Sequence, residues 1–219
     1  DVGVLEFRVY AALHWDGDSS EAAAAVGALE TYLGGAPAPT GHVRDRQTAI
    51  CALAHWRLAA GDFAGAEAAF AQLRAPYLIE STSVCAAAVN AQLAAARGRP
   101  DAGSTLARLD ILLAAGSDRR HLLMGVGNLI AARLYEARGD LRHALALTRR
   151  RNAWGNQLLS TQLREEGRLA ALVGDTVGAV RAYRHYLALR SNPEPTLRPD
   201  AERVRAALQR VRASSSNDR

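Results

Sequence analysis

Six histidines are the first residues to consider for chemistry, because imidazole can act as an acid, a base or a metal ligand. They are His14, His42, His55, His121, His143 and His185. No two of them stand three or four residues apart, so no helix presents two of them on one face as paired metal ligands. The sequence therefore predicts no metal site, and each histidine is expected to be an isolated surface or interhelical side chain.

The carboxylates and glycines that could serve catalysis are also spaced unfavourably for it. Glu165 and Glu166 are adjacent, so their side chains point in different directions on a helix. Gly125 and Gly127 follow no predicted strand and do not form a phosphate-binding loop. Since no nucleophile–base pair is evident either, we expect a chain that is not an enzyme and needs no cofactor.

Two cysteines, Cys51 and Cys85, lie within helical segments of the sequence. We expect both to be reduced, because a small thiol side chain commonly fills a helical core position. A disulfide is the alternative, and it would require the two Cα atoms to lie within ~7 Å of each other. Reduced thiols favour a cytoplasmic location.

The elements that carry these residues are predicted to be helical throughout. The chain is 49% hydrophobic but only 5% aromatic, and alanine, the best helix former, supplies much of the apolar share. No apolar run is long enough to cross a membrane. We expect eleven helices, over residues 2–14, 19–33, 43–60, 63–74, 81–97, 100–115, 118–138, 141–151, 155–173, 176–190 and 199–213.

Glycines interrupt this helical pattern at regular intervals. The interrupting residues are Gly17, Gly61, Gly98, Gly139 and Gly174, at successive spacings of 44, 37, 41 and 35 residues. A recurrence of this length with helix on both sides of each break is typical of stacked helical hairpins. The sequence therefore predicts an all-α fold, a right-handed α-solenoid of about five antiparallel hairpins followed by a C-terminal capping helix.

Three of the hairpins resemble the tetratricopeptide repeat, in which small residues and an aromatic side chain let neighbouring helices pack closely. The residues that carry the resemblance are Ala54, Gly61, Asp62, Phe63, Ala66 and Phe70; Ala132, Tyr135, Gly139, Asp140, Leu141 and Ala144; and Gly167, Gly174, Asp175, Ala179 and Tyr183. The first and third hairpins depart from the pattern, with Val26 in place of the aromatic and Gly103 in place of the alanine. The resemblance implies a surface for a partner rather than a pocket for chemistry.

The end of the chain is predicted to close the array. Val204, Leu208 and Val211 form one narrow apolar stripe, as expected of a helix that shields the last hairpin. The segment from Ala179 to this helix is similar to the end of the bacterial transcriptional activator domain, and comparable arrays follow bacterial Ser/Thr kinase domains. Because Met124 is the only methionine, we expect the chain to be part of a larger protein.

These patterns divide the chain into five expected segments. They are a first hairpin, displaced from the rest, at 1–33; a Gly/Pro loop at 34–42; four hairpins at 43–190; a Pro-rich turn and capping helix at 191–213; and a disordered tail at 214–219.

A partner-binding groove is expected on the inner face of the first helix of each hairpin, as the resemblance implies. Carried onto this sequence, that face contains His55, Gln92, Leu129, Ile130, Arg133, Arg164 and Arg168. Its middle is apolar and its C-terminal end is basic, which suits an amphipathic segment with acidic residues at one end. The alternative is that the apolar middle belongs to the core.

All 27 basic side chains are arginines, and the net charge is +5. They are spread along every helix without interleaved aromatic residues, so direct nucleic-acid binding is not expected. The run Arg149, Arg150 and Arg151 precedes Trp154. It is expected to be a solvated helix end, which the helix dipole favours. The alternative is a contact for a phosphate or an acidic partner.

The sequence thus favours a non-catalytic interaction or sensing module, a cytoplasmic fragment of a larger bacterial regulatory or signalling protein that binds a protein or peptide partner. The alternative is a regulatory or dimerisation domain of a DNA-binding transcriptional activator, so homodimerisation stays open.

Overall fold

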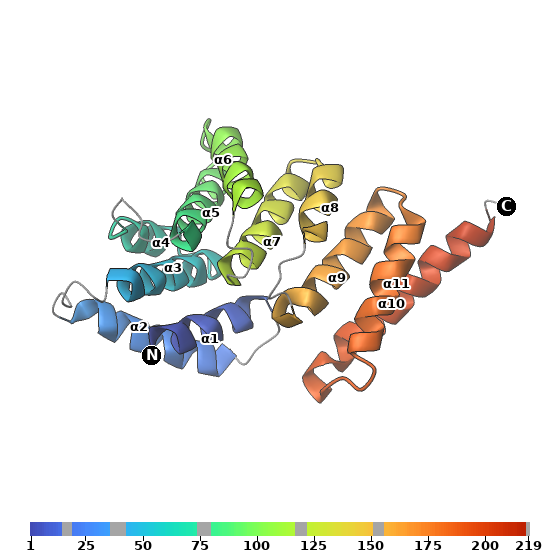
Figure 1. Ribbon diagram of the computed structural model, residues 1–219, viewed down its shortest axis with the longest axis horizontal. Coiled ribbons are helices and arrows are strands. Elements are labelled where there is room, and N and C mark those ends of the chain that lie inside the picture. Colours follow the sequence, from blue (N-terminus) through green and yellow to red (C-terminus); the bar gives the residue numbers. More distant parts are fainter. Residues whose placement is uncertain (15–18, 36–42, 74–79, 117–121, 151–155, 218–219) are drawn as a thin grey trace. The chain divides into compact units, whose positions relative to one another are not determined.

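The computed structural model describes residues 1–14, 19–35, 43–73, 80–116, 122–150 and 156–217. These residues form eleven α-helices, one short 3₁₀ helix and no strand, and helices that follow one another pack as adjacent pairs (Figure 1). The predicted all-α fold is confirmed, and each predicted helix is present. The break at Gly17 and residues 36–42 of the Gly/Pro loop lie outside the described residues.

The chain forms two compact units, Asp1–Ile130 and Ala131–Arg219, with the boundary inside one helix. Unit 1 contains α1 (Val2–His14), α2 (Ser19–Gly34), α3 (Val43–Ala59), α4 (Phe63–Phe70), α5 (Glu80–Ala96), α6 (Ala102–Ala115) and the first part of α7 (Leu122–Ala137). Each of α1, α3 and α5 packs against the second helix of its own hairpin, and α3 also packs against both α1 and α5. The first hairpin thus contacts the second, through α1 and α2 packed on α3.

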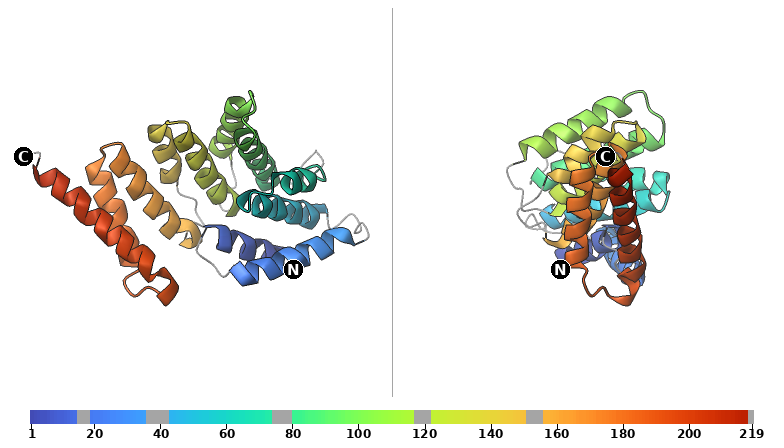
Figure 2. Two further views of the ribbon diagram at one scale, coloured as in Figure 1. Left: turned by 180° about the vertical axis from the view of Figure 1, so that it is seen from behind. Right: turned by 90° about the vertical axis from the view of Figure 1, so that its right-hand side faces the viewer.

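Unit 2 contains the end of α7, then α8 (Leu141–Arg149), α9 (Asn156–Leu172), α10 (Thr176–Leu189), the 3₁₀ helix η2 (Pro195–Leu197) and α11 (Arg198–Asn217). Successive helices from α8 to α11 pack against one another, and Figure 2 shows α11, in red, lying along α10. Val204 and Leu208 of the predicted stripe are buried. The helix continues past residue 213 through part of the tail that we expected to be disordered, and Ser214 Oγ donates to the carbonyl oxygen of Arg210.

Left-handed glycines end the first helices of four hairpins. The backbone φ angles are +77° at Gly61, +60° at Gly98, +83° at Gly139 and +80° at Gly174. Glycine adopts this conformation without the steric cost that a Cβ would add, so it closes a helix at these points.

The aspartate after three of these glycines starts the second helix. The side chains of Asp62, Asp140 and Asp175 accept hydrogen bonds from the backbone N–H groups of Gly65, His143 and Gly178, at 2.8, 3.1 and 2.9 Å. This is N-capping, which satisfies donors that the helix itself leaves unpaired. In the third hairpin, Asp101 makes no such bond, and this is one of the two hairpins that depart from the repeat pattern.

Small residues allow close packing between helices in both units. A Cβ on Gly167 would overlap the ring of Tyr183, which fills the space between α9 and α10. A Cβ on Gly127 would lie 2.8 Å from Cδ2 of Leu113 and 3.0 Å from Cγ1 of Val84. Gly127 of α7 is thus required for helix packing.

A disulfide joins Cys51 of α3 to Cys85 of α5, so our prediction of two reduced thiols is wrong. The Cα atoms are 6.1 Å apart, although 34 residues separate the two cysteines in the sequence. Direct packing of α3 on α5 brings them within bonding range. The disulfide also removes the argument from reduced thiols for a cytoplasmic location.

Candidate interaction surface

The residues expected to line the middle of the groove, both apolar and uncharged polar, are buried or half-buried. His55, Leu129 and Ile130 are no more than 3% exposed, and Gln92 is half-buried. The structure therefore favours the alternative, in which the apolar middle of this face belongs to the core.

His55 belongs to a buried polar cluster that joins three helices of unit 1. We define the polar cluster as Glu6 and Tyr10 of α1, His55 of α3 and Gln92 of α5. The rings of Tyr10 and His55 have centroids 5.7 Å apart, and the side chain of Gln92 lies close enough to His55 to influence its pKa. The cluster therefore links neighbouring first helices within the unit.

Burial shifts the pKa values of Glu6 and His55 in opposite directions. Loss of hydration raises the pKa of Glu6 to about 7, although the charge of Arg44 opposes the shift. Burial lowers the pKa of His55 to about 4, although the nearby Gln92 side chain opposes the shift. His55 is consequently neutral near pH 7, in agreement with the expected interhelical histidine.

The basic residues at the other end of the predicted groove form ion pairs within unit 2. Arg168 of α9 donates two bonds of 2.6 Å to Glu136 of α7 and one of 2.9 Å to Glu165. Arg164 pairs with Asp200 of α11, whose side chain is only 7% exposed. We define the ion-pair chain as Glu136, Arg168, Glu165, Arg164 and Asp200.

The ion-pair chain holds α7, α9 and α11 together by pairing the charges of Arg164 and Arg168 with carboxylates. The pKa of Glu136 lies below its ordinary value, mainly because Glu136 accepts hydrogen bonds from Arg168. Of the three predicted groove arginines, Arg164 and Arg168 are engaged in this way, and Arg133 alone is exposed. The expected basic wall is therefore largely a structural link between α7, α9 and α11.

Two open hollows in unit 2 adjoin α8: the larger lies between α8 and the turn that joins α9 to α10, and the smaller lies between α8, α9 and α10. The larger, of about 610 Å³, is lined by Arg142, Leu145, Ala146, Arg149, Val173, Gly174 and Asp175. The smaller, of about 320 Å³, is lined by Arg149, Leu163, Glu166, Arg181, Ala182 and His185. Arg149 lines both, so the hollows adjoin, and we call them together the α8–α10 groove.

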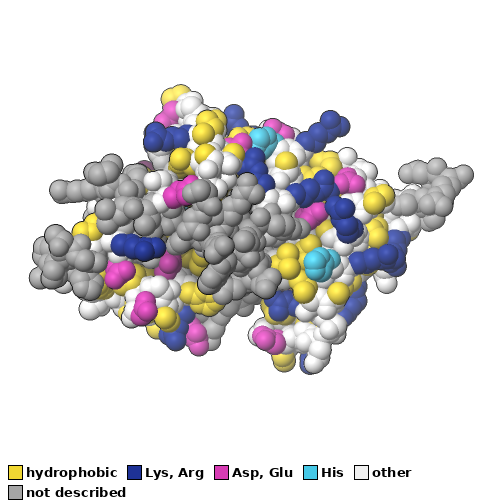
Figure 3. Space-filling model, in the orientation of Figure 1, with side chains coloured by type: hydrophobic (Ala, Val, Ile, Leu, Met, Phe, Trp, Pro, Cys, Tyr) yellow, Lys and Arg dark blue, Asp and Glu magenta, His cyan; other side chains and the backbone are white. Residues whose placement is uncertain are grey.

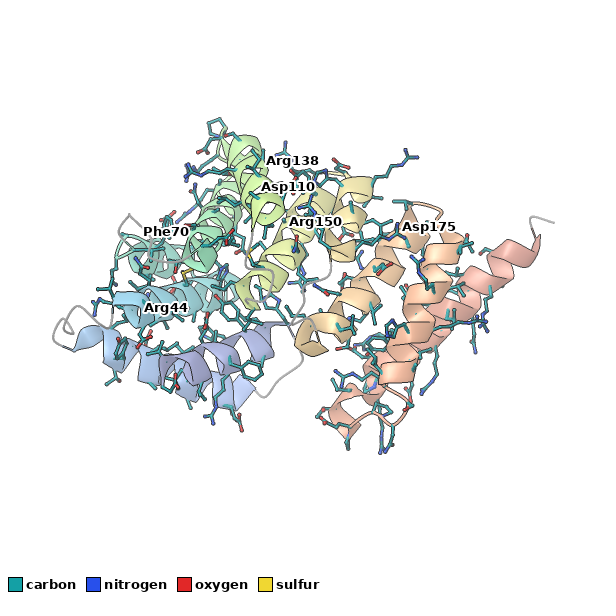
Figure 4. All side chains as sticks on the ribbon, viewed as in Figure 1. Arg44, Phe70, Asp110, Arg138, Arg150 and Asp175 are labelled. Atoms are coloured by element: carbon teal, nitrogen blue, oxygen red, sulfur yellow. A yellow bond between two sulfur atoms is a disulfide. The ribbon has the colours of Figure 1, made fainter. Side chains whose placement is uncertain are left out.

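Arg149 is exposed at the C-terminal end of α8, and its guanidinium is held by two carboxylates in the α8–α10 groove. Its Nε donates to Oε1 of Glu166 at 3.2 Å, and Nη2 donates to Oδ2 of Asp175 at 2.5 Å. Figure 4 places Asp175 at the turn between α9 and α10, where it also caps α10. A Cβ on Gly178 would overlap both Asp175 and Arg149, so this glycine leaves room for the contact. Arg151 lies outside the described residues.

The rims of the α8–α10 groove carry positive charge that is not engaged in this way. Arg142 is exposed and forms no ion pair with a described residue, whereas the Arg181 side chain is 71% exposed and approaches Glu166 only to 3.7 Å. Both carboxylates of the lining, Glu166 and Asp175, already bond Arg149. Figure 3 shows arginine side chains beside hydrophobic ones over this part of unit 2. The surface is therefore suited to an anionic partner with apolar side chains.

The sequence did not reveal the α8–α10 groove. Arg149 and Asp175 are 26 residues apart and belong to different hairpins. The one available signal was the basic run at the end of α8, for which an acidic partner was already the alternative.

Across the described ranges, no helix is long and apolar enough to span a membrane. The same residues contain no group of three or more His, Cys, Asp or Glu side chains placed to hold a metal ion. Comparison with protein-family models, with curated proteins and with solved structures gave no match.

Proposed function

We propose that this chain is a non-catalytic interaction module, a tetratricopeptide-like right-handed array that belongs to a larger bacterial regulatory or signalling protein. The observation that carries the proposal is the repeated turn. In three hairpins, a left-handed glycine and a capping aspartate occupy equivalent positions and make equivalent hydrogen bonds. Arrays of such hairpins stack into extended surfaces that bind partners.

The α8–α10 groove is the partner site that we favour within this module. The inner face of unit 1 is filled by its own side chains and by the disulfide, so it offers little room. The groove, by contrast, is open, and its larger hollow has the volume of ordinary ligand sites. This replaces the inner-face location that the sequence favoured.

A partner-capture experiment with one blocked variant tests this function. Ala146 is exposed and lines the larger hollow, so Ala146→Trp fills the hollow from its rim without entering the core. Ala188→Trp adds the same side chain at an exposed position of α10 that lines neither hollow. The intact chain and Ala188→Trp should retain the same protein from a bacterial lysate, and Ala146→Trp should lose it. Retention of no protein by the intact chain contradicts the function, whereas equal retention by both variants contradicts the site.

The regulatory or dimerisation alternative makes a different prediction. A dimerisation domain should change mass with concentration in light scattering, and it should need no second protein. A concentration-dependent dimer together with an empty capture experiment would support that alternative over the interaction module.

A further inference from the structure

We infer that the α8–α10 groove binds an acidic peptide segment in which apolar side chains lie between carboxylates. The inference rests on the proposed interaction function and specifies the chemistry of the partner.

The α8 wall of the groove alternates charge and apolar surface. Arg142, Ala146 and Arg149 share one helix face, because they are four and three residues apart. The seven residues from Arg142 to Arg149 advance the helix by about 10 Å. Leu145 and Ala146 lie between the two arginines in the lining of the larger hollow. A bound segment would therefore meet a cation, an apolar patch and a second cation in succession.

The α10 wall contributes one cation, Arg181, and a polar ring, His185. Arg181 and His185 are one helical turn apart, with Ala182 beside them in the lining of the smaller hollow. Leu163 of α9 contributes apolar surface to the same hollow. Both walls thus combine cations at the rim with small or apolar side chains below.

The charge that remains available favours carboxylates. Glu166 and Asp175 carry two negative charges, which Arg149 and the more distant Arg181 balance. The three arginines and two carboxylates leave the lining with a net charge of +1, and the exposed Arg142 has no ion-pair partner among the described residues. Guanidinium groups bind carboxylates through paired hydrogen bonds, so Arg142 and the solvent-facing side of Arg181 can attract an acidic segment. Because two carboxylates already hold Arg149, this side chain loses little conformational entropy when a partner binds.

The lining favours a peptide over a nucleic acid. Among the described residues, no Phe, Tyr or Trp lines either hollow, so a base would find only His185 and the arginine side chains to stack on. The two internal carboxylates would also repel a continuous row of phosphates. A peptide can place separated carboxylates at the rims and apolar side chains between them.

An unbiased peptide selection tests the inference. A random peptide library displayed on phage is selected against the intact chain, and enriched peptides are titrated by fluorescence anisotropy. We expect enriched sequences with acidic residues on both sides of apolar ones, and affinities that fall as salt rises from about 0.05 to 0.5 M. Enrichment of basic or uncharged peptides, or no enrichment, would overturn the inference.

Two matched charge reversals locate the binding site. Arg142→Glu with Arg181→Glu should weaken an enriched peptide by about tenfold or more, because both rims of the groove become repulsive. Arg198→Glu with Arg205→Glu makes the same charge change at exposed positions of α11 outside the lining, and should change affinity less than about threefold. Circular dichroism checks that both variants keep their helicity, and Arg142→Gln with Arg181→Gln gives a milder test without repulsion.

The possible failures are distinguishable from failure of the interaction function. Peptides that bind both double variants equally overturn the acidic-peptide groove but leave an interaction module intact. If the selection retains no peptide but the intact chain captures a protein, the acidic-peptide groove is likewise overturned and the interaction module stays intact. Only an empty capture experiment contradicts the function itself.

Discussion

The two units are built from similar hairpins, but their first helices are held together by different interactions. In unit 1, α3 and α5 are joined by the Cys51–Cys85 disulfide, and the buried polar cluster around His55 includes residues of α1, α3 and α5. In unit 2, α7, α9 and α11 are joined by the ion-pair chain through Arg168 and Arg164. The hairpin specifies the architecture and leaves open how neighbouring hairpins are joined.

The difference predicts that the units respond to different conditions. A disulfide responds to reductant and is insensitive to salt, whereas partly exposed ion pairs are screened by salt and insensitive to reductant. Unit 1 also contains two buried ionisable groups, Glu6 and His55, whose contributions to the pH dependence of stability have opposite signs. Each unit can therefore be perturbed while the other serves as its internal control.

The largest effect is expected from removal of the disulfide. The bridge closes a loop between residues 34 apart, so its loss should lower the free energy of unfolding by about 3–4 kcal/mol. Urea unfolding of the oxidised protein and of the Cys51→Ala, Cys85→Ala variant measures this change. Hydrogen exchange should rise in α3 and α5 and stay unchanged in α9 and α10. Full alkylation of both cysteines in the native, unreduced protein would show that the bridge is not formed.

The second effect comes from breaking the ion-pair chain of unit 2. Asp200→Ala removes the carboxylate that pairs with Arg164 and Arg203, and leaves Arg164 with the more distant Glu165. It should cost about 2–3 kcal/mol, because the bond to Arg164 is charge-assisted and Asp200 is nearly buried. Hydrogen exchange should rise in α11 and stay unchanged in unit 1. Glu202→Ala, at an exposed position of the same helix, should change stability by less than about 0.5 kcal/mol. Equal costs for the two substitutions would mean that the chain contributes nothing.

Two glycines sharpen the comparison through effects of opposite sign. Gly167→Ala places a methyl group into the ring of Tyr183, so it should destabilise unit 2 by about 1–2 kcal/mol. Gly27→Ala, in α2, meets no atom within 4 Å and should stabilise its helix by about 0.5–1 kcal/mol. Thermal unfolding of the two variants measures both changes. A melting temperature that rises in both variants would show that packing against Tyr183 does not require glycine.

Local features of the fold were predictable from the sequence because they depend on neighbouring residues. Gly61, Gly139 and Gly174 end helices through their own backbone conformation, and the next residue caps the following helix. Such signals act within a few residues, so the number and order of the helices could be predicted without knowing what packs where.

The candidate site could not be predicted in the same way, because its contacts join distant residues. Register placed Arg168 near the inner face, but it could not show that Glu136, 32 residues away, already binds that guanidinium. The same reasoning assigned His55 to a groove, whereas packing of α1 on α3 buries it. Whether a charged or polar side chain is free depends on these partners.

The smallest effect is expected from pH, because the two shifted groups of unit 1 oppose each other. Glu6 has a folded pKa of about 7 against an ordinary value of 4.5, so the folded state binds more protons and stability falls as pH rises through that range. His55 has a folded pKa of about 4 against 6.5, so stability rises with pH between those values. Between pH 4.5 and 6.5 the two slopes cancel, and the intact unit should show little pH dependence from these groups.

Removing either group should uncover the slope of the other. His55→Gln should leave a unit 1 that loses stability as pH rises from 4.5 to 7, through Glu6 alone. Glu6→Gln should leave a unit that gains stability as pH rises from 4 to 6.5, through His55 alone. Urea unfolding across this range, monitored by hydrogen exchange in α1 and α3, measures both slopes. Slopes of the same sign in the two variants would contradict the opposed shifts, and unit 2, followed in the same samples through α9, controls for effects of pH on the rest of the chain.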